Sequence, residues 1–160
     1  MKYAFLFFVF IGFSTFAQKT SLTFNTHLPY CGGARPTPEM AKGTTAPAAG
    51  QKFALIRVGG TKVKWITLND KGQWKGRLKK GTYNIYREEK RMTIVEIKSK
   101  HKLSSSELVQ YKGDECITEY CNTPDFKMEI TGYAEFTFTI NGKCNIGFRP
   151  CLEYVGPLAP

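Results

Sequence analysis

The sequence predicts a mostly β protein: a single antiparallel β-sandwich of about seven strands with a disulfide-bearing insertion. After residue 50, short runs rich in β-branched and aromatic residues are separated by turn sequences such as Gly59-Gly60. Several of these runs alternate between apolar and polar side chains, which is the period of a half-buried strand. The chain of 160 residues is long enough for one domain with a core and short for two.

The first 17 residues predict a secretory signal peptide. Lys2 precedes an apolar run over residues 3–13, and small residues lead to Ala17, after which we expect cleavage. No later stretch has the ~18 consecutive apolar residues that a membrane-spanning helix needs. We therefore expect an exported protein, periplasmic or extracellular and associated with the cell envelope, with no transmembrane segment in its mature chain.

Residues 18–50 are expected to form an N-terminal segment that ends in a surface loop. The stretch 35–50 contains three prolines and two glycines, and it shows neither helical nor alternating periodicity. The sandwich domain would then occupy residues 51–160.

The clearest strand pattern is that of residues 73–78. Trp74 and Leu78 face one side of this run, whereas Lys75 and Arg77 face the other. Asn141-Gly142 predicts a tight hairpin turn, because both residues tolerate a positive φ. The predicted strands, with ends placed to about 2–4 residues, are 52–58, 62–68, 73–78, 82–87, 92–98, 133–140 and 144–148.

The insertion is expected at about residues 99–130, where the strand pattern weakens. Ser104 and the glutamate that follows it, Glu107, could cap one short helix. The rest of the insertion is polar and contains Cys116 and Cys121.

Residues 53–87 carry a recognisable motif of turn and core positions, Thr67, Asp70, Gly72, Trp74, Leu78, Gly81 and Tyr83. This motif resembles the carboxypeptidase regulatory-like, or prealbumin-like, β-sandwich module, and the chain is also similar to small exported Bacteroidetes-type proteins of unassigned function. The resemblance implies an Ig-like sandwich in an accessory or adhesive role without catalysis. Within it, residues 69–72 are expected to make a hairpin turn.

All five cysteines follow the predicted leader, and thiols in an oxidising compartment usually pair. We favour Cys116–Cys121, which would close a small loop, and a bridge from Cys31 to Cys144 or Cys151. A direct Cys144–Cys151 bridge is disfavoured, because a continuous strand would hold these residues ~23 Å apart, against a Cα spacing of ~4.4–6.8 Å in disulfides.

The residues that could support catalysis or metal binding are few. A dyad of Cys31 and His27 would be the nucleophile and base of a cysteine-dependent enzyme or redox protein. The cysteine spacings do not fit a structural zinc site, which favours paired ligands two to four residues apart. We therefore expect no metal, no cofactor and no enzymatic activity, with the Cys31 enzyme and a disulfide-linked subunit as alternatives.

The formal net charge of +10 indicates either a solvated basic surface with no specific partner or a surface that meets an acidic partner. In an exported chain this partner is an acidic glycan or an envelope protein rather than nucleic acid. Arg35 and Arg149 each precede a proline and lie near a cysteine, so they could share an anion, or each could bind carbonyls of its own loop. The oligomeric state is left open. The predicted binding residues are Lys62, Lys64, Lys75, Arg77, Lys79, Arg35 and Arg149.

Overall fold

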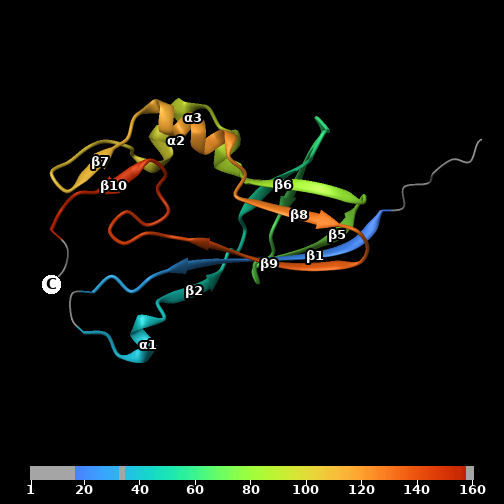
Figure 1. Cartoon of the computed structure of the whole chain (residues 1–160), viewed down its shortest axis with the longest axis horizontal. Helices are drawn as coiled ribbons and strands as arrows, with labels where there is room; N and C mark the ends of the chain where they lie inside the picture. The colour runs from blue at the N-terminus through green and yellow to red at the C-terminus, as the bar shows by residue number, and fades with distance from the viewer. Residues whose placement is uncertain (1–16, 33–34, 158–160) are drawn as a thin grey trace, which may run out of the picture.

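The computed structural model describes residues 17–32 and 35–157. Two four-stranded sheets face each other, which confirms the mostly β sandwich (Figure 1). The described part has ten strands rather than seven. The first sheet consists of β1 (Gln18–Leu28), β2 (Thr44–Pro47), β5 (Gln73–Leu78) and β9 (Ala134–Asn141). The second sheet consists of β3 (Lys52–Arg57), β4 (Val63–Thr67), β6 (Gly81–Arg87) and β8 (Phe126–Ile130), in the order β4-β3-β6-β8.

Strand β1, which the sequence did not predict, is central to the first sheet. It pairs in antiparallel fashion with β5 and β2 along one edge and in parallel with β9 along the other. Its inward side chains include Leu22 and Phe24, which are both fully buried. The segment 18–28 is therefore part of the sandwich and not only a lead into it.

The tight hairpin predicted at Asn141-Gly142 is wrong. The alternating pattern before it does form a strand, β9, but this strand pairs with β1 and not with a strand that follows it. The chain instead turns after β9, and Lys143 bridges to Gly147. The predicted strand 144–148 is accordingly absent: these residues form turns, with positive φ at Asn145 and Gly147.

The turn at residues 69–72 is present, but it joins the two sheets instead of closing a hairpin. The Gly72 amide donates to the Asn69 carbonyl at 2.9 Å, and Asn69 Oδ1 accepts from the amides of Lys71 and Gln73. Gly72 has φ +68°, and a Cβ on it would lie 2.4 Å from the Phe24 carbonyl oxygen. Glycine is needed here both for the backbone conformation and for the close approach of β1.

The core between the sheets is built around aromatic rings. Phe24 stacks on Phe53 of the opposite sheet, with ring centroids 4.2 Å apart, and Phe138 lies 5.0 Å from Phe24. The other buried members of this core come from both sheets and their connections: Leu22, Ala48, Leu55, Ile66, Leu68, Leu78, Tyr83, Ile85, Met128, Ile130 and Ile140.

The segment between β6 and β8 folds into a small helical part with its own core. It contains η1 (Glu88–Arg91), α2 (Ile94–His101), β7 (Val109–Tyr111) and α3 (Asp114–Asn122), and β7 pairs with β10 (Leu152–Tyr154) from the end of the chain. A four-residue helix, α1 (Pro38–Ala41), lies apart from it in the chain between β1 and β2. The buried apolar members of the second core are Ile97, Leu103, Ile117, Ile146 and Leu152.

Helix α2 replaces the predicted strand 92–98. Thr93 caps its first turn, and Glu96 bonds back to the Thr93 amide at 2.7 Å, which together form a capping box. Alternation of apolar residues over so short a run does not distinguish a strand from a helix, and the capping pair decides for the helix. The helix cap predicted at Ser104 is wrong, because α2 ends at His101 and residue 104 begins no helix.

Two disulfides connect parts of the chain that are distant in sequence. Cys31 is bonded to Cys144, one of its two predicted partners, with Cα atoms 5.4 Å apart. The predicted Cys116–Cys121 bridge is wrong: Cys116 is bonded to Cys151, and Cys121 is unbridged. Cys116 and Cys121 both lie on α3, where five residues rotate side chains by ~140° and raise them by ~7.5 Å. Burial raises the pKa of the Cys121 thiol, so it is held in the neutral form.

The Cys31/His27 dyad does not form. The Cys31 sulfur is in the disulfide, and His27 Nδ1 lies 3.0 Å from Thr45 Oγ1 on the neighbouring strand β2. The nucleophile that the alternative required is therefore not available as a thiol.

Candidate functional site

A cavity of about 610 Å³ opens at the end of the sandwich where the chain enters β1. It lies between the two sheets, and its floor is formed by the core side chains of Leu55, Leu78 and Tyr83. Helices α2 and α3 lie toward the other end of the molecule (Figure 1). The cavity thus lies against the sandwich core, whose side chains stay almost fully buried there.

Cations surround this apolar floor. None of the described residues that line the cavity is Asp or Glu. The cations converge because β3 ends, β4 begins and β5 ends at the same end of the sandwich. They are Arg57, Lys62, Lys64, Arg77 and Lys79.

One of these cations is held by a hydrogen bond, and another lies against the backbone of a neighbouring strand. Lys64 Nζ donates to the Arg77 carbonyl at 2.9 Å and lies 5.1 Å from the Trp74 ring centroid, so its side chain joins the two sheets. Arg57 lies against Gly81: a Cβ built there would be 2.6 Å from Arg57 Nε. Gly81, a position of the family-like motif, thus leaves room for a guanidinium at the cavity.

The structure brings together four of the predicted binding residues: Lys62, Lys64, Arg77 and Lys79 all line this cavity. Sequence reasoning missed Arg57. The signal for it was the turn at Gly59-Gly60, because residues that flank such a turn lie close together.

The other three predicted binding residues lie elsewhere. Lys75 lines a separate cavity of about 330 Å³, which Arg77 and Glu135 also line. Arg35 is exposed in the segment before α1. Arg149 donates to the carbonyls of Ile146 at 3.0 Å and Asn145 at 3.3 Å, so it binds its own loop, which was the alternative considered for it.

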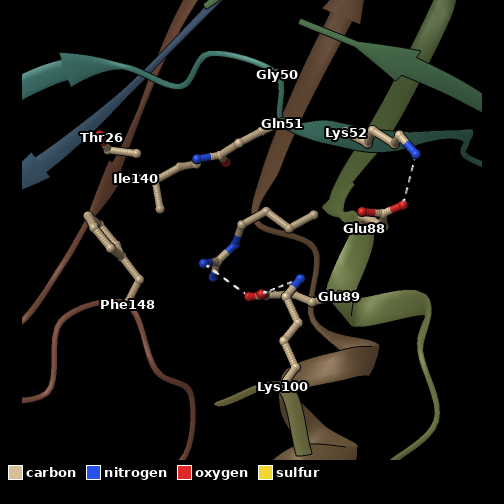
Figure 2. A pocket seen from close by; sticks show the side chains of 10 residues that line it. Thr26, Gly50, Gln51, Lys52, Glu88, Glu89, Lys100, Ile140 and Phe148 are labelled. Atoms are coloured by element: carbon tan, nitrogen blue, oxygen red, sulfur yellow. Dashed lines mark ion pairs between the residues drawn. The ribbon is translucent and has the colours of Figure 1, made fainter. Parts of the chain in front are cut away.

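A second cluster of ionisable groups lies where the sandwich meets the helical part, beside a cavity of about 310 Å³ (Figure 2). Asp125 accepts from the Arg87 amide at 2.8 Å and from Arg87 Nε at 3.0 Å, and Lys90 Nζ lies 3.1 Å from the same carboxylate. Lys90 also donates to the Thr123 carbonyl at 2.8 Å. No sequence pattern marked these residues, because the cluster forms only when segments around 87–90 and 123–125 meet.

Glu89 is at the centre of the same cluster. Its carboxylate accepts a hydrogen bond from the Tyr120 hydroxyl and lies 2.9 Å from His101 Nε2 and 3.3 Å from Arg87 Nη1. Figure 2 shows Lys100 beside Glu89, and the two charged groups are 3.6 Å apart. Since each buried charge has an opposite charge or a hydrogen bond, we interpret the cluster as the connection between the two parts of the fold.

The surroundings of Glu89 predict a loss of stability in acid. Burial alone would raise its pKa, but the Tyr120 hydrogen bond and the charges of Arg87 and His101 outweigh burial and lower the pKa below the ordinary 4.5. A depressed carboxyl pKa stabilises the fold fully above the unfolded value and contributes less as pH falls through the folded one. The urea midpoint should therefore decrease between pH 6 and pH 3, and it should decrease less in Glu89→Gln. An equal decrease in both proteins would contradict the assignment.

Comparisons with known proteins find only distant similarity. No family model matches the chain and no curated protein matches it, so the resemblance to the carboxypeptidase regulatory-like module stays a prediction. A DUF3823 family protein from Parabacteroides merdae has 13% identity over 78% of this chain and 46% of its own, with a TM-score of 0.35. The shaft pilin SpaA of Lactobacillus rhamnosus GG has 14% identity over 80% of this chain and 49% of its own, also with a TM-score of 0.35.

The chain spans about half the length of each of these two proteins. At such low TM-scores we draw nothing from them about fold or activity. Within residues 17–32 and 35–157, no helix is long and apolar enough to cross a membrane, and no group of three or more His, Cys, Asp or Glu side chains is placed to hold a metal ion.

Proposed function

We propose that the protein is an exported, non-catalytic binding module that takes an acidic glycan into the cavity at the open end of its sandwich. One observation supports this most directly: five cations surround an apolar floor, and no acid is among the described residues that line the cavity. An uncompensated group of cations is costly in the free protein, and an anionic ligand would relieve their mutual repulsion.

The shape and chemistry of the cavity suit a sugar acid. Its volume of about 610 Å³ lies within the ~300–1,000 Å³ typical of ligand sites. The guanidinium group of Arg57 can bind a carboxylate in bidentate fashion, and lysines add charge without fixing geometry.

Export is supported by the cysteines as well as by the predicted leader. The two disulfides, Cys31–Cys144 and Cys116–Cys151, are bonds that persist in oxidising compartments and are rare in the cytosol. The cell envelope also holds acidic polysaccharides, which are the partners that the positive net charge favours.

The proposal predicts that cations at the cavity contribute more to the affinity for an acidic glycan than the same number of cations elsewhere on the surface. Replacing Lys62, Arg77 and Lys79 with Ser should weaken binding of tetragalacturonate by at least about three-fold in isothermal titration calorimetry, because each exposed ion pair contributes ~0.2–1 kcal/mol.

The matched control replaces the exposed lysines Lys42, Lys71 and Lys127 with Ser, which removes the same charge away from the cavity. It should change the affinity by less than about two-fold. If both triple variants lose binding equally, the charge acts without a specific site and the proposal is wrong.

A further inference from the structure

The chain enters the sandwich at the wall of the basic cavity. Ala17, the residue after which leader cleavage is expected, itself lines the cavity. Gln18 is the first residue of β1 and pairs with Leu78, whose side chain is part of the cavity floor. The bond expected to be cut is thus at the edge of the proposed binding site.

We propose that the α-ammonium group of Gln18, created when the leader is removed, is part of the anion-binding site. In the precursor the Gln18 nitrogen is a neutral amide bonded to the Ala17 carbonyl carbon. After cleavage the same atom carries a positive charge, and Ala17 no longer forms part of the cavity wall. This inference rests on the proposed function, and it adds that the site is completed by maturation.

The new terminus would be held in place by its strand. Many chain ends are poorly ordered, but β1 is hydrogen-bonded on both sides almost from its first residue. Its pairing with β5 begins at Gln18 opposite Leu78, and its pairing with β9 begins at Thr20 opposite Ala134. A charge fixed beside the cavity can act on a bound carboxylate without the entropic cost of ordering a loose terminus.

The identity of residue 18 provides a matched control. In an N-terminal glutamine the α-amino nitrogen can attack the side-chain amide carbon, which forms a lactam ring and releases ammonia. The product, pyroglutamate, has the same chain length but no charge at its nitrogen. It separates the effect of the ammonium from the effect of removing Ala17.

The test compares three purified forms of the protein: one that begins at Gln18 with a free amine, the same chain after cyclisation, and one that retains residues 14–17. Intact mass confirms each form. Tetragalacturonate binding is measured at pH 6, where an α-amino group with its ordinary pKa of about 7.7–8.0 is protonated. The free-amine form should bind about five-fold more tightly than the cyclised form, which corresponds to ~1 kcal/mol for one unit charge at 4 Å in water. The form that retains residues 14–17 should also bind more weakly.

Equal affinity of the free-amine and cyclised forms would overturn the inference and leave the proposed function intact. Absence of binding by every form, including the free-amine form, would overturn both. The variant that lacks Lys62, Arg77 and Lys79 separates the two further, because it should lose affinity in every form if the cavity is the site. Thermal unfolding of each form checks that the N-terminus has not altered the fold.

Discussion

Replacement of Asp125 with Ala is expected to lower the free energy of unfolding by about 3–5 kcal/mol, the usual cost of leaving a buried charge without its partner. The Asp125 side chain has an exposed fraction of 9%, and the Lys90 side chain opposite it has one of 5%. Removing the carboxylate leaves the buried Lys90 and the partly buried Arg87 with less compensation. It also removes the acceptor of the Arg87 backbone amide. Urea unfolding at pH 7 measures the loss.

The control for this prediction is a solvent-exposed ion pair of the same protein. Glu88 lies 3.5 Å from Lys52, and both side chains are about half exposed, at 41% and 53%. Glu88→Ala should cost no more than about 1 kcal/mol, since exposed pairs contribute little. If Asp125→Ala costs as little as Glu88→Ala, the cluster does not connect the helical part to the sandwich in the way we describe.

Removal of the Cys31–Cys144 disulfide, by replacing both cysteines with Ser, is expected to be the most destabilising change among the described bridges. The two cysteines are 113 residues apart in sequence, so the bridge restricts most of the unfolded chain. A chain-entropy treatment gives a loss of roughly 5 kcal/mol for a loop of this size. The change should appear as a lower urea midpoint.

The second bridge supplies the comparison. Cys116 and Cys151 are 35 residues apart, for which the same treatment gives roughly 4 kcal/mol. The Cys116/Cys151 double Ser variant should therefore be more stable than the Cys31/Cys144 variant. The opposite order would show that the bridges act mainly through the folded state, with Cys116–Cys151 holding α3 to the end of the chain.

The local patterns of the sequence were sufficient for individual strands. The two-residue alternation of apolar and polar residues predicted β5 and β9. The turn sequences that separate the runs after residue 50 placed β3, β4 and β6 to within a few residues. The same patterns selected four of the five cations at the cavity. They failed where a short apolar run was ambiguous, as at α2, and where a strand lay in a segment for which no strand was predicted, as at β1.

The sequence by itself determined the positions of five strands, β3 to β6 and β9, that cysteines would pair, and that the basic residues near the β4 and β5 segments would share a region. Only the tertiary structure decided which strands are neighbours and which cysteines meet. Leu22 of β1 pairs with Phe136 of β9 across more than a hundred residues, and Asp125 meets Arg87 across a whole helical insertion. The periodicity of a segment indicates which of its faces is buried. Which strands and cysteines pair depends on how segments that are distant in the sequence pack together, so a local pattern does not contain it.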